Sequence, residues 1–197
     1  MKSIPTIILA SNSPRRKKLL RKAGYRFNVF VSNTSEESKE KDPHKLTLLL
    51  SKRKAQAVSK EFADNTIIAA DTMVFMDNML FGKPKDFEEA VNMLLSFSGK
   101  THKIVTGITI IHNNKIITES DEALIKLRKL AKKEIIEFIK STNPYDKAGG
   151  YSVEELPKDF IEKIKGEMST ILGLPLNIVN KHLEFLKIKG RSLKKKN

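Results

Sequence analysis

Residues 10–20, Ala-Ser-Asn-Ser-Pro-Arg-Arg-Lys-Lys-Leu-Leu, constrain this chain most, because they join two different elements through a short turn. Thr6–Leu9, directly before them, is an apolar run in which β-branched residues dominate, and this pattern predicts a buried strand. Ser13 and Pro14 are typical of a helix N-cap followed by proline at the first helical position. The apolar residues after them recur at helical spacing as far as Gly24, so we expect a strand, a tight turn and a helix.

This turn has the geometry of an anion site. The predicted turn Ser11–Ser13 points backbone N–H groups and the positive end of the helix toward whatever lies above it. Arg15 and Arg16 stand in the first helical turn, where a positive charge is intrinsically unfavourable. Two arginines there are explained if an anion, most simply a polyphosphate, binds between them. The alternative is an ordinary surface helix with a basic face, and this stretch alone leaves both interpretations open.

Length and composition bound the class of protein. The 197 residues suffice for one large domain or two small lobes, and we expect a single α/β domain over residues 1–190 with a basic tail over 191–197. The absence of cysteine excludes disulfides, thiol catalysis and thiolate metal sites. Neither a signal peptide nor a membrane-spanning run is recognisable, so we expect a cytoplasmic protein without membrane contact.

The charge balance points to a phosphate-bearing partner. There are 37 lysines and arginines against 23 acidic residues, for a formal net charge of +14. Nucleic acid and nucleotide are both compatible with this excess, and so is a solvated lysine-rich surface. Aromatic residues make up only 7% of the chain and tryptophan is absent, which argues against a dedicated binder of single-stranded nucleic acid.

Helix and strand patterns alternate along the rest of the chain. Helical spacing with capping residues predicts further helices over 42–62, 86–99, 131–141 and 176–186. Apolar or alternating runs predict strands over 27–31, 66–70, 103–111, 115–118 and 122–127. The four histidines are scattered without metal-ligand spacing, so we interpret them as surface or packing residues.

Several polar residues stand where such a fold binds ligands. Asp71-Thr72 ends the apolar part of the buried strand run 66–70, which continues over 73–75 to a turn at Asp77-Asn78, and we interpret Asp71 as lying at the mouth of the strand, where α/β sheets bind their ligands. Gly82 and Pro84 fix the backbone on either side of Lys83, which is a sensible way to hold an ammonium still. The acidic stretch 32–41 is either a solvated linker or a loop that brings a carboxylate to the phosphates, and the residues alone favour the linker.

Six motifs occur in order along nearly the whole chain and together resemble the Maf family of nucleoside triphosphate pyrophosphatases, also called septum formation inhibitor proteins. One motif alone is weak, whereas six at suitable separations are specific. They are Ala10–Arg16 with Leu19-Leu20, Ala70–Thr72, Gly82–Pro84, Ser98–His102 with Thr106-Gly107, Asp146–Tyr151, and Gly173–Pro175.

The resemblance implies a fold, a reaction and a set of site residues. The fold is α/β of the inosine-triphosphatase-like type, a long mixed sheet flanked by helices with a cleft between two lobes. The reaction is hydrolysis of a nucleoside triphosphate to the monophosphate and pyrophosphate with a divalent metal, Mg²⁺ or Mn²⁺. Asp71 is implied as the catalytic base, and Glu36 and Asp71 as metal ligands. Substrate-binding positions are implied for Ser11, Ser13, Arg15, Arg16, Lys54, Thr72, Lys83, Lys147 and Glu154.

The Asp-Lys-Ala-Gly form of the motif at Asp146 resembles the subgroup that acts on dTTP and UTP, with one departure. That subgroup usually continues Tyr-Gly-Ile-Gln, whereas this chain has Tyr151-Ser152-Val153-Glu154. A glutamine amide both donates and accepts hydrogen bonds, but an ionised Glu154 only accepts. Our hypothesis is a preference shifted toward bases with adjacent donors, or a broad preference. The alternative is that Glu154 faces solvent and selects nothing.

Two functions of different classes compete at this point. The first is a pyrophosphatase that removes particular nucleotides. The second is a regulatory nucleic-acid-binding or cell-division-inhibiting protein with incidental nucleotide binding, supported by the net charge of +14. Asp71 discriminates between them, because a carboxylate repels a phosphate backbone. A homodimer is expected only from the family.

Overall fold

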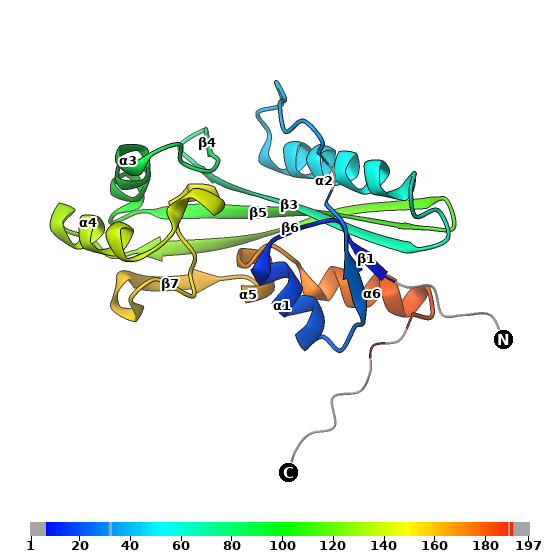
Figure 1. The fold of residues 1–197 in the computed structure, drawn as a ribbon. Helices are drawn as coiled ribbons and strands as arrows, with labels where there is room; N and C mark the ends of the chain where they lie inside the picture. Colours follow the sequence, from blue (N-terminus) through cyan, green and yellow to red (C-terminus); the bar gives the residue numbers. More distant parts are fainter. Residues whose placement is uncertain (1–6, 32, 189, 191–197) are drawn as a thin grey trace, which may run out of the picture.

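The computed structural model describes residues 7–31, 33–188 and 190, and one mixed sheet runs through it (Figure 1). Six strands lie in the order β2-β1-β3-β5-β6-β7, and β4 pairs with β3. Pairing is parallel among β2, β1 and β3 and antiparallel elsewhere. The strands are β1 (Ile7–Leu9), β2 (Phe27–Val29), β3 (Thr66–Met76), β4 (Met79–Phe81), β5 (Thr101–His112), β6 (Lys115–Leu127) and β7 (Ile161–Lys165).

Helices pack around both ends of this sheet. They are α1 (Pro14–Lys22), α2 (Pro43–Ser59), α3 (Phe87–Phe97), α4 (Lys132–Ser141), α5 (Met168–Ile171) and α6 (Leu176–Phe185). Three short 3₁₀ helices, η1 (Pro144–Asp146), η2 (Ala148–Gly150) and η3 (Lys158–Phe160), lie between α4 and β7. Figure 1 shows α2 on one side of the long strands and α1 with α6 on the other, while α3 and α4 lie toward the opposite end. The predicted mixed sheet flanked by helices is therefore confirmed.

Local capping signals set where three helices begin. The side chain of Ser13 accepts a hydrogen bond from the backbone N–H of Arg16, and Pro14 follows as the first helical residue. Asp42 and Asp86 cap α2 and α3 in the same way, at 2.9 and 2.8 Å from the backbone nitrogens three residues on. These carboxylates also stabilise the positive helix ends. All three starts agree with the sequence prediction.

Strand β3 separates two hydrophobic clusters because its side chains alternate between the two faces of the sheet. Ile67 and Ala69 join the smaller cluster, where they pack with Val58 of α2. Ile68 and Ala70 join the larger cluster, which includes residues of α1, α3, α4 and α6. These four residues are fully buried, so this part of β3 contributes to the hydrophobic core on both faces of the sheet.

Helix α2 lies directly on β5 at a glycine. A Cβ atom at Gly107 would lie 2.4 Å from the backbone carbonyl carbon of Thr47, so only glycine permits this approach. The contact fixes the height of α2 above the sheet. It therefore fixes Lys54, which α2 carries about two turns further on.

The end of β1 brings the first motif beside Asp71. Strand β1 pairs in parallel with β3 as far as Ile68, and the N–H of Ala10 donates to the Ile68 carbonyl oxygen at 2.8 Å. The chain then leaves the sheet next to the position where β3 continues to Asp71. The prediction that Asp71 lies at the mouth of its own strand is wrong, because β3 continues past Asp71 to Met76 and pairs with β5 as far as Phe75. The strand end that forms the site is that of β1.

Other boundaries differ from the sequence prediction for identifiable reasons. The predicted strands 115–118 and 122–127 are one strand, β6, whose polar centre has side-chain partners, such as Thr170 of α5, which donates to Asp121. Strand β2 ends at Val29, and α2 ends at Ser59 rather than near residue 62. No helix in the described part of the chain has the length and apolar character needed to span a bilayer. The predicted tail 191–197 lies outside the described residues.

Candidate active site

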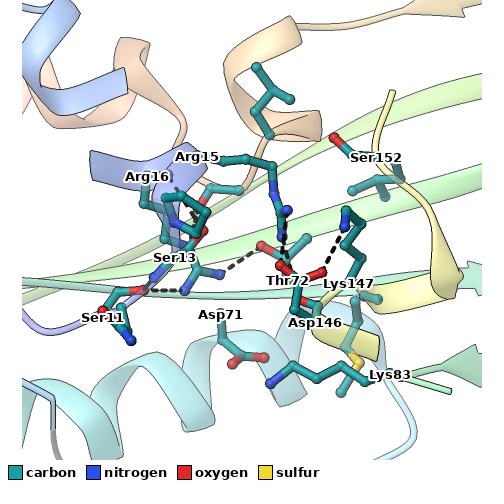
Figure 2. Close-up of a pocket in the computed structure, with 18 of the residues that line it drawn as sticks. Ser11, Ser13, Arg15, Arg16, Asp71, Thr72, Lys83, Asp146, Lys147 and Ser152 are labelled. Carbon is teal, nitrogen blue, oxygen red and sulfur yellow. Dashed lines mark hydrogen bonds and ion pairs between the residues drawn. The ribbon is translucent and has the colours of Figure 1, made fainter. Parts of the chain in front are cut away.

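The predicted site residues gather around one cavity of about 640 Å³ (Figure 2). The turn after β1 and the start of α1 form one wall, and α2 and β3 form the next. The segment after β4 and the η1–η2 region form the opposite wall. Of the sequence-predicted residues, Ser11, Ser13, Arg15, Arg16, Glu36, Lys54, Asp71, Thr72, Lys83 and Lys147 line this cavity.

The turn before α1 is held by its own side chains. Ser11 is buried, and its Oγ accepts a hydrogen bond from the backbone N–H of Ser13 at 3.3 Å. The Ser13 hydroxyl caps the helix by accepting from the N–H of Arg16 at 3.5 Å. Both serines therefore shape the amino end of α1, which carries the positive end of the helix dipole toward the cavity.

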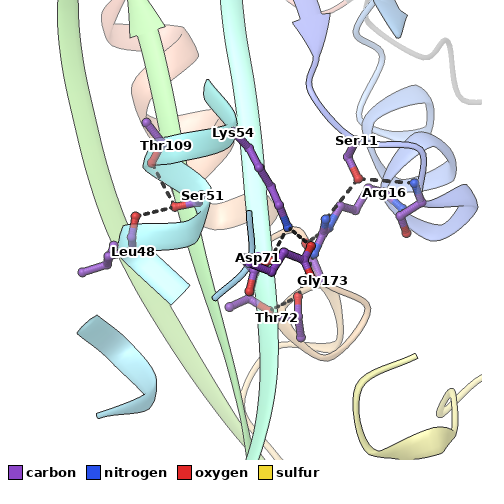
Figure 3. A network of polar contacts seen from close by, with 12 residues as sticks. Ser11, Arg16, Leu48, Ser51, Lys54, Asp71, Thr72, Thr109 and Gly173 are labelled. Carbon is purple, nitrogen blue, oxygen red and sulfur yellow. Dashed lines mark hydrogen bonds and ion pairs between the residues drawn. The ribbon is translucent and has the colours of Figure 1, made fainter. Parts of the chain in front are cut away.

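Arg16 points inward and is bound on three sides (Figure 3). Its Nε donates to the carbonyl oxygen of Gly173 at 2.7 Å, Nη1 to Ser11 Oγ at 3.0 Å and Nη2 to Thr72 Oγ1 at 3.0 Å. Burial lowers the pKa of this guanidinium, and the negative charge of Asp71 opposes that shift. Three of its five N–H donors are thus fixed within the protein. Arg16 ties together the α1 turn, β3 and the segment before α6.

Arg15 is placed differently from its neighbour. Its guanidinium reaches across the cavity toward Asp146, with Nη2 3.4 Å from the backbone oxygen and Nη1 3.6 Å from Oδ2. These are long contacts for a charged pair, and Asp146 is exposed. Arg15 is therefore the arginine of the pair that is held less firmly by the protein.

Asp71, Glu36 and Lys54 meet at one point of the cavity, and Figure 3 shows Lys54 beside Asp71. The Lys54 Nζ atom lies 2.5 Å from Asp71 Oδ1 and 2.8 Å from Glu36 Oε1. Asp71 is buried within β3, whereas Glu36 comes from the exposed loop before α2. The two predicted metal-ligating carboxylates are thus brought together, and α2 supplies the cation between them.

Glu36 stays ionised in this environment. Burial raises the pKa of its carboxyl group, but the hydrogen bond and charge of Lys54 lower it, with help from Lys83 and Arg16, and the net direction is down. Figure 2 shows the Lys83 side chain pointing toward Asp71. Lys83 itself is exposed and lines the cavity from the segment between β4 and α3.

Lys147 lies in the cavity wall with its ammonium bound inside the protein. The side chain is only 4% exposed. Nζ donates to the carbonyl oxygen of Asn143 and lies 2.7 Å from Asp146 Oδ1 and 3.3 Å from Glu155 Oε2. Three protein acceptors thus match the three N–H donors of the ammonium. This arrangement favours a role in shaping the wall over the predicted direct contact with substrate.

Thr72 heads a line of buried hydroxyl groups that crosses the sheet. Thr106 Oγ1 donates to the Thr170 carbonyl oxygen at 2.8 Å, so its single proton is used there. Thr72 Oγ1, 3.0 Å from Thr106 Oγ1, must then be the donor in that pair, while it accepts from Arg16. Thr170 Oγ1 in turn donates to Asp121 Oδ2 at 2.5 Å. The orientation of Thr72 is therefore set from behind the cavity.

Glu154 is the predicted site residue that the structure does not bring to the cavity. It is exposed, and its Oε1 lies 2.8 Å from Nζ of Lys18 on α1. It lines only a smaller neighbouring cavity of about 240 Å³. This placement agrees with the alternative that Glu154 faces solvent, and it gives no support to the hypothesis that Glu154 contacts the base.

An apolar wall completes the cavity, and the sequence analysis missed it. Its members come from β3, β5, the segment after η2 and the end of α5, and they are Met73, Val74, Ile104, Val153, Ile171 and Leu172. Helix α5 has four residues, too few for a recognisable helical pattern. For the segment after η2, the neighbouring Asp146–Tyr151 motif was the sequence signal that could have indicated a place in the cavity wall.

The charges around the cavity suit a polyanion attached to an apolar group. Five basic residues and three acidic residues line it, so cations are in excess. Arg15 and Arg16 come from the α1 turn, Lys54 from α2, and Lys83 and Lys147 from the facing wall, so cations line the cavity on more than one side together with the apolar residues. Such an arrangement can bind phosphates through its cations and a nucleoside through its apolar residues.

Comparisons with known proteins identify the family to which this chain belongs. A protein of Thermosipho africanus named dTTP/UTP pyrophosphatase is 45% identical over 88% of this chain and 89% of its own length. One of Aquifex aeolicus with the same name is 41% identical over 86% of this chain and 90% of its own. The solved structure of the Staphylococcus aureus Ham1 protein covers 92% of this chain and 99% of its own, with a TM-score of 0.53 and 15% identity, a likeness of fold alone. The family described as Maf-like protein matches residues 6–186, and this chain therefore belongs to it.

Proposed function

We propose that this protein hydrolyses pyrimidine nucleoside triphosphates, dTTP and UTP among them, to the nucleoside monophosphate and pyrophosphate. The observation that carries the proposal is the cavity in which the amino end of α1, Arg15, Lys54 and Lys83 surround the buried carboxylate Asp71. Relatives named dTTP/UTP pyrophosphatase, which match this chain over most of their length, support the same reaction.

The basic residues have a defined task in this proposal. A triphosphate needs several cations or N–H donors, because its oxygens carry the charge that builds up as pyrophosphate leaves. Among the described residues, Arg15 and Lys83 are the cavity-lining cations that the protein holds least firmly, because Arg15 has long contacts with Asp146 and Lys83 is exposed. Lys54 contacts the carboxylates of Glu36 and Asp71, so its ammonium neutralises their charge, and in this proposal it also attracts the phosphates of the substrate.

The chemical step is attack of water on the α-phosphorus. The water oxygen forms a bond to that phosphorus, and the bond from the α-phosphorus to the bridging oxygen breaks. Pyrophosphate leaves with the bridging oxygen and its electron pair. The water proton passes to Asp71, the base in this proposal, whose buried position on β3 holds it still.

A divalent cation fits the same two carboxylates. Glu36 and Asp71 supply hard oxygen ligands that converge on the Lys54 ammonium, so they lie within reach of one ion. In residues 7–31, 33–188 and 190, no cluster of three or more His, Cys, Asp or Glu side chains could hold a metal. Mg²⁺ is commonly held by one or two carboxylates with substrate phosphates completing its shell, which matches this donor set. Bound there, Mg²⁺ or Mn²⁺ would neutralise phosphate charge and polarise the phosphoryl group.

The second hypothesis, a regulatory nucleic-acid-binding or cell-division-inhibiting protein, gains no support. The basic residues converge with Asp71 and Glu36 in one cavity of about 640 Å³, which suits a single nucleotide and a metal ion rather than an extended phosphate backbone. The names of the relatives also describe an enzyme. A homodimer and a cytoplasmic location stay predictions from the sequence.

The test is pyrophosphate release from a panel of dTTP, UTP, dCTP, CTP, dATP and GTP, with Mg²⁺, with Mn²⁺ and with a chelator. We expect release from the thymine and uracil nucleotides, loss in D71N, and loss with the chelator. E154Q should leave the order of substrates unchanged, since Glu154 lies outside the cavity. No turnover of any nucleotide by the folded protein would overturn the proposal.

A further inference from the structure

The wall that carries Asp146, Lys147 and Ser152 is irregular, and one buried hydrogen bond fastens it to the sheet. This wall, residues 146–153, contains the 3₁₀ helix η2 and the last residue of η1, and no strand. It nevertheless supplies a large part of the cavity lining. Tyr151 lies within it and hydrogen-bonds through its hydroxyl to Nε2 of His102 on β5.

The partners of this bond are enclosed. His102 is 1% exposed and Tyr151 6%. The imidazole stacks on the ring of Phe97 with centroids 4.4 Å apart, and Tyr151 meets the imidazole edge to face at 5.7 Å. Three aromatic rings from α3, β5 and the wall thus form one packed unit behind the cavity.

The direction of the hydrogen bond follows from counting donors. His102 Nδ1 is the buried side-chain atom without a hydrogen-bond partner among the described residues. If the tyrosine hydroxyl donates to Nε2, only the Nδ1–H is unmatched. If Nε2–H donated instead, both Nδ1 and the hydroxyl proton would lack a partner. Burial lowers the pKa of His102 to about 4 and raises that of Tyr151, so the imidazole is neutral and the phenol protonated at neutral pH.

The same wall is tied to the segment that carries Lys83. The N–H of Gly149 donates to the Gly82 carbonyl oxygen at 2.9 Å. Gly149 has φ of 72°, and a Cβ there would lie 3.0 Å from Val74 and 3.3 Å from Phe97. The glycine therefore lets the wall sit directly on β3 and on the ring that stacks with His102. Motifs far apart in the sequence meet at this point.

We propose that His102 is a positioning residue that acts through Tyr151 to hold the nucleoside-facing wall of the cavity. The inference rests on the proposed function, since it assigns the wall to the nucleoside rather than to the phosphates. Tyr151 lines the cavity with Val74, Ile104 and Val153, which are apolar, whereas Asp146 at the start of the wall contacts Arg15 of the α1 turn. Loosening this wall weakens nucleotide binding and base selection, and leaves the chemistry at Asp71 nearly intact.

The test compares Y151F, H102F and H102Q with a matched control, Y25F. Tyr25 is also buried, and its hydroxyl donates to Asn180 Oδ1 at 3.1 Å, but it does not line the cavity. Y151F and H102F should each raise KM for dTTP by about tenfold with kcat changed less than about threefold, and lower the preference for dTTP over dATP. H102Q retains an acceptor for the tyrosine hydroxyl and should recover part of the loss. Y25F should match the wild type in KM and preference.

Coupling between the two residues is the sharper readout. In H102F/Y151F both partners of the hydrogen bond are gone, so the KM of the double variant should be close to that of either single variant. If the wild type is active and Y151F has the same KM and base preference as Y25F, the inference is overturned. It is also overturned if the KM increases of the two single variants multiply in the double variant. A wild type that turns over no nucleotide would instead overturn the proposed function, so the two failures are distinct.

Discussion

The Nζ atom of Lys54 lies 2.5 Å from Oδ1 of Asp71, and both groups are mostly withdrawn from solvent, with side chains 16% and 9% exposed. The same ammonium lies 2.8 Å from Glu36 Oε1, so it links the rigid strand β3 to the exposed loop before α2. A buried carboxylate is stable as an anion only with such a partner. The relationship couples the position of the proposed base to the packing of α2.

Replacing Lys54 by methionine should therefore damage both activity and stability. K54M removes the ammonium that directly contacts both carboxylates, so we expect kcat/KM for dTTP to fall by about 10²-fold and the free energy of unfolding by about 2 kcal/mol. K52M, at an exposed position of the same helix, should change neither. Pyrophosphate-release kinetics and urea unfolding measure the two effects. A K54M protein with wild-type kinetics would refute this role of Lys54.

Lysine substitutions of Arg15 and Arg16 should have different effects on the free energy of unfolding. R16K cannot reproduce three bonds from one planar guanidinium, so unfolding free energy should drop by about 2 kcal/mol. R15K should leave stability within about 0.5 kcal/mol, because the Arg15 contacts with Asp146 are long and partly exposed. R15M should raise KM about tenfold through loss of a phosphate contact. The reverse pattern, with R15K as the unstable variant, would contradict the assignment.

Gly107 should tolerate no side chain. In G107A the new Cβ would meet the Thr47 carbonyl carbon at 2.4 Å and the Leu48 nitrogen at 2.6 Å, both backbone atoms of α2 that cannot move alone. We expect a loss of about 3 kcal/mol in unfolding free energy and a fall in activity, because α2 carries Lys54. At Gly82 a Cβ would meet nothing within 4 Å, so G82A serves as the control for stability. Equal stability of the two variants in urea would argue against the close α2–β5 contact.

What the sequence could predict was local. Ser13, Asp42 and Asp86 were identified as caps because the donor nitrogen of each lies three residues away in the sequence. The prediction that Asp71 lies at a strand end was wrong. The apolar run 66–70 indicates burial, but it does not show that pairing with β5 carries one strand past Asp71.

The residues that meet at the site are far apart in the sequence, and local sequence patterns do not show such contacts. The inward turn of Arg16 depends on the Gly173 carbonyl, 157 residues away. Glu154 is three residues from Tyr151, yet it faces Lys18 on the other side of the wall. The resemblance implied a substrate-binding position for Glu154 and none for Tyr151, whereas the structure places Tyr151 at the larger cavity and Glu154 outside it. Their orientation follows from the packing of His102, Phe97 and Gly149, which a sequence pattern does not contain.

The buried imidazole of His102 should make stability depend on pH in a definite window. Burial lowers its pKa to about 4 in the folded protein, against about 6.5 when unfolded, so between these values the unfolded chain binds more protons. Stability is therefore lost as pH falls from 6.5 toward 4, by on the order of 3 kcal/mol from this residue. Carboxylates such as Glu36 add their own loss at low pH, so the comparison must be with H102Q, which lacks only this group. Urea unfolding at pH 7.5, 6, 5 and 4.5 should show the wild type losing its advantage over H102Q as the pH falls, and parallel curves would mean that the imidazole titrates normally in the folded protein.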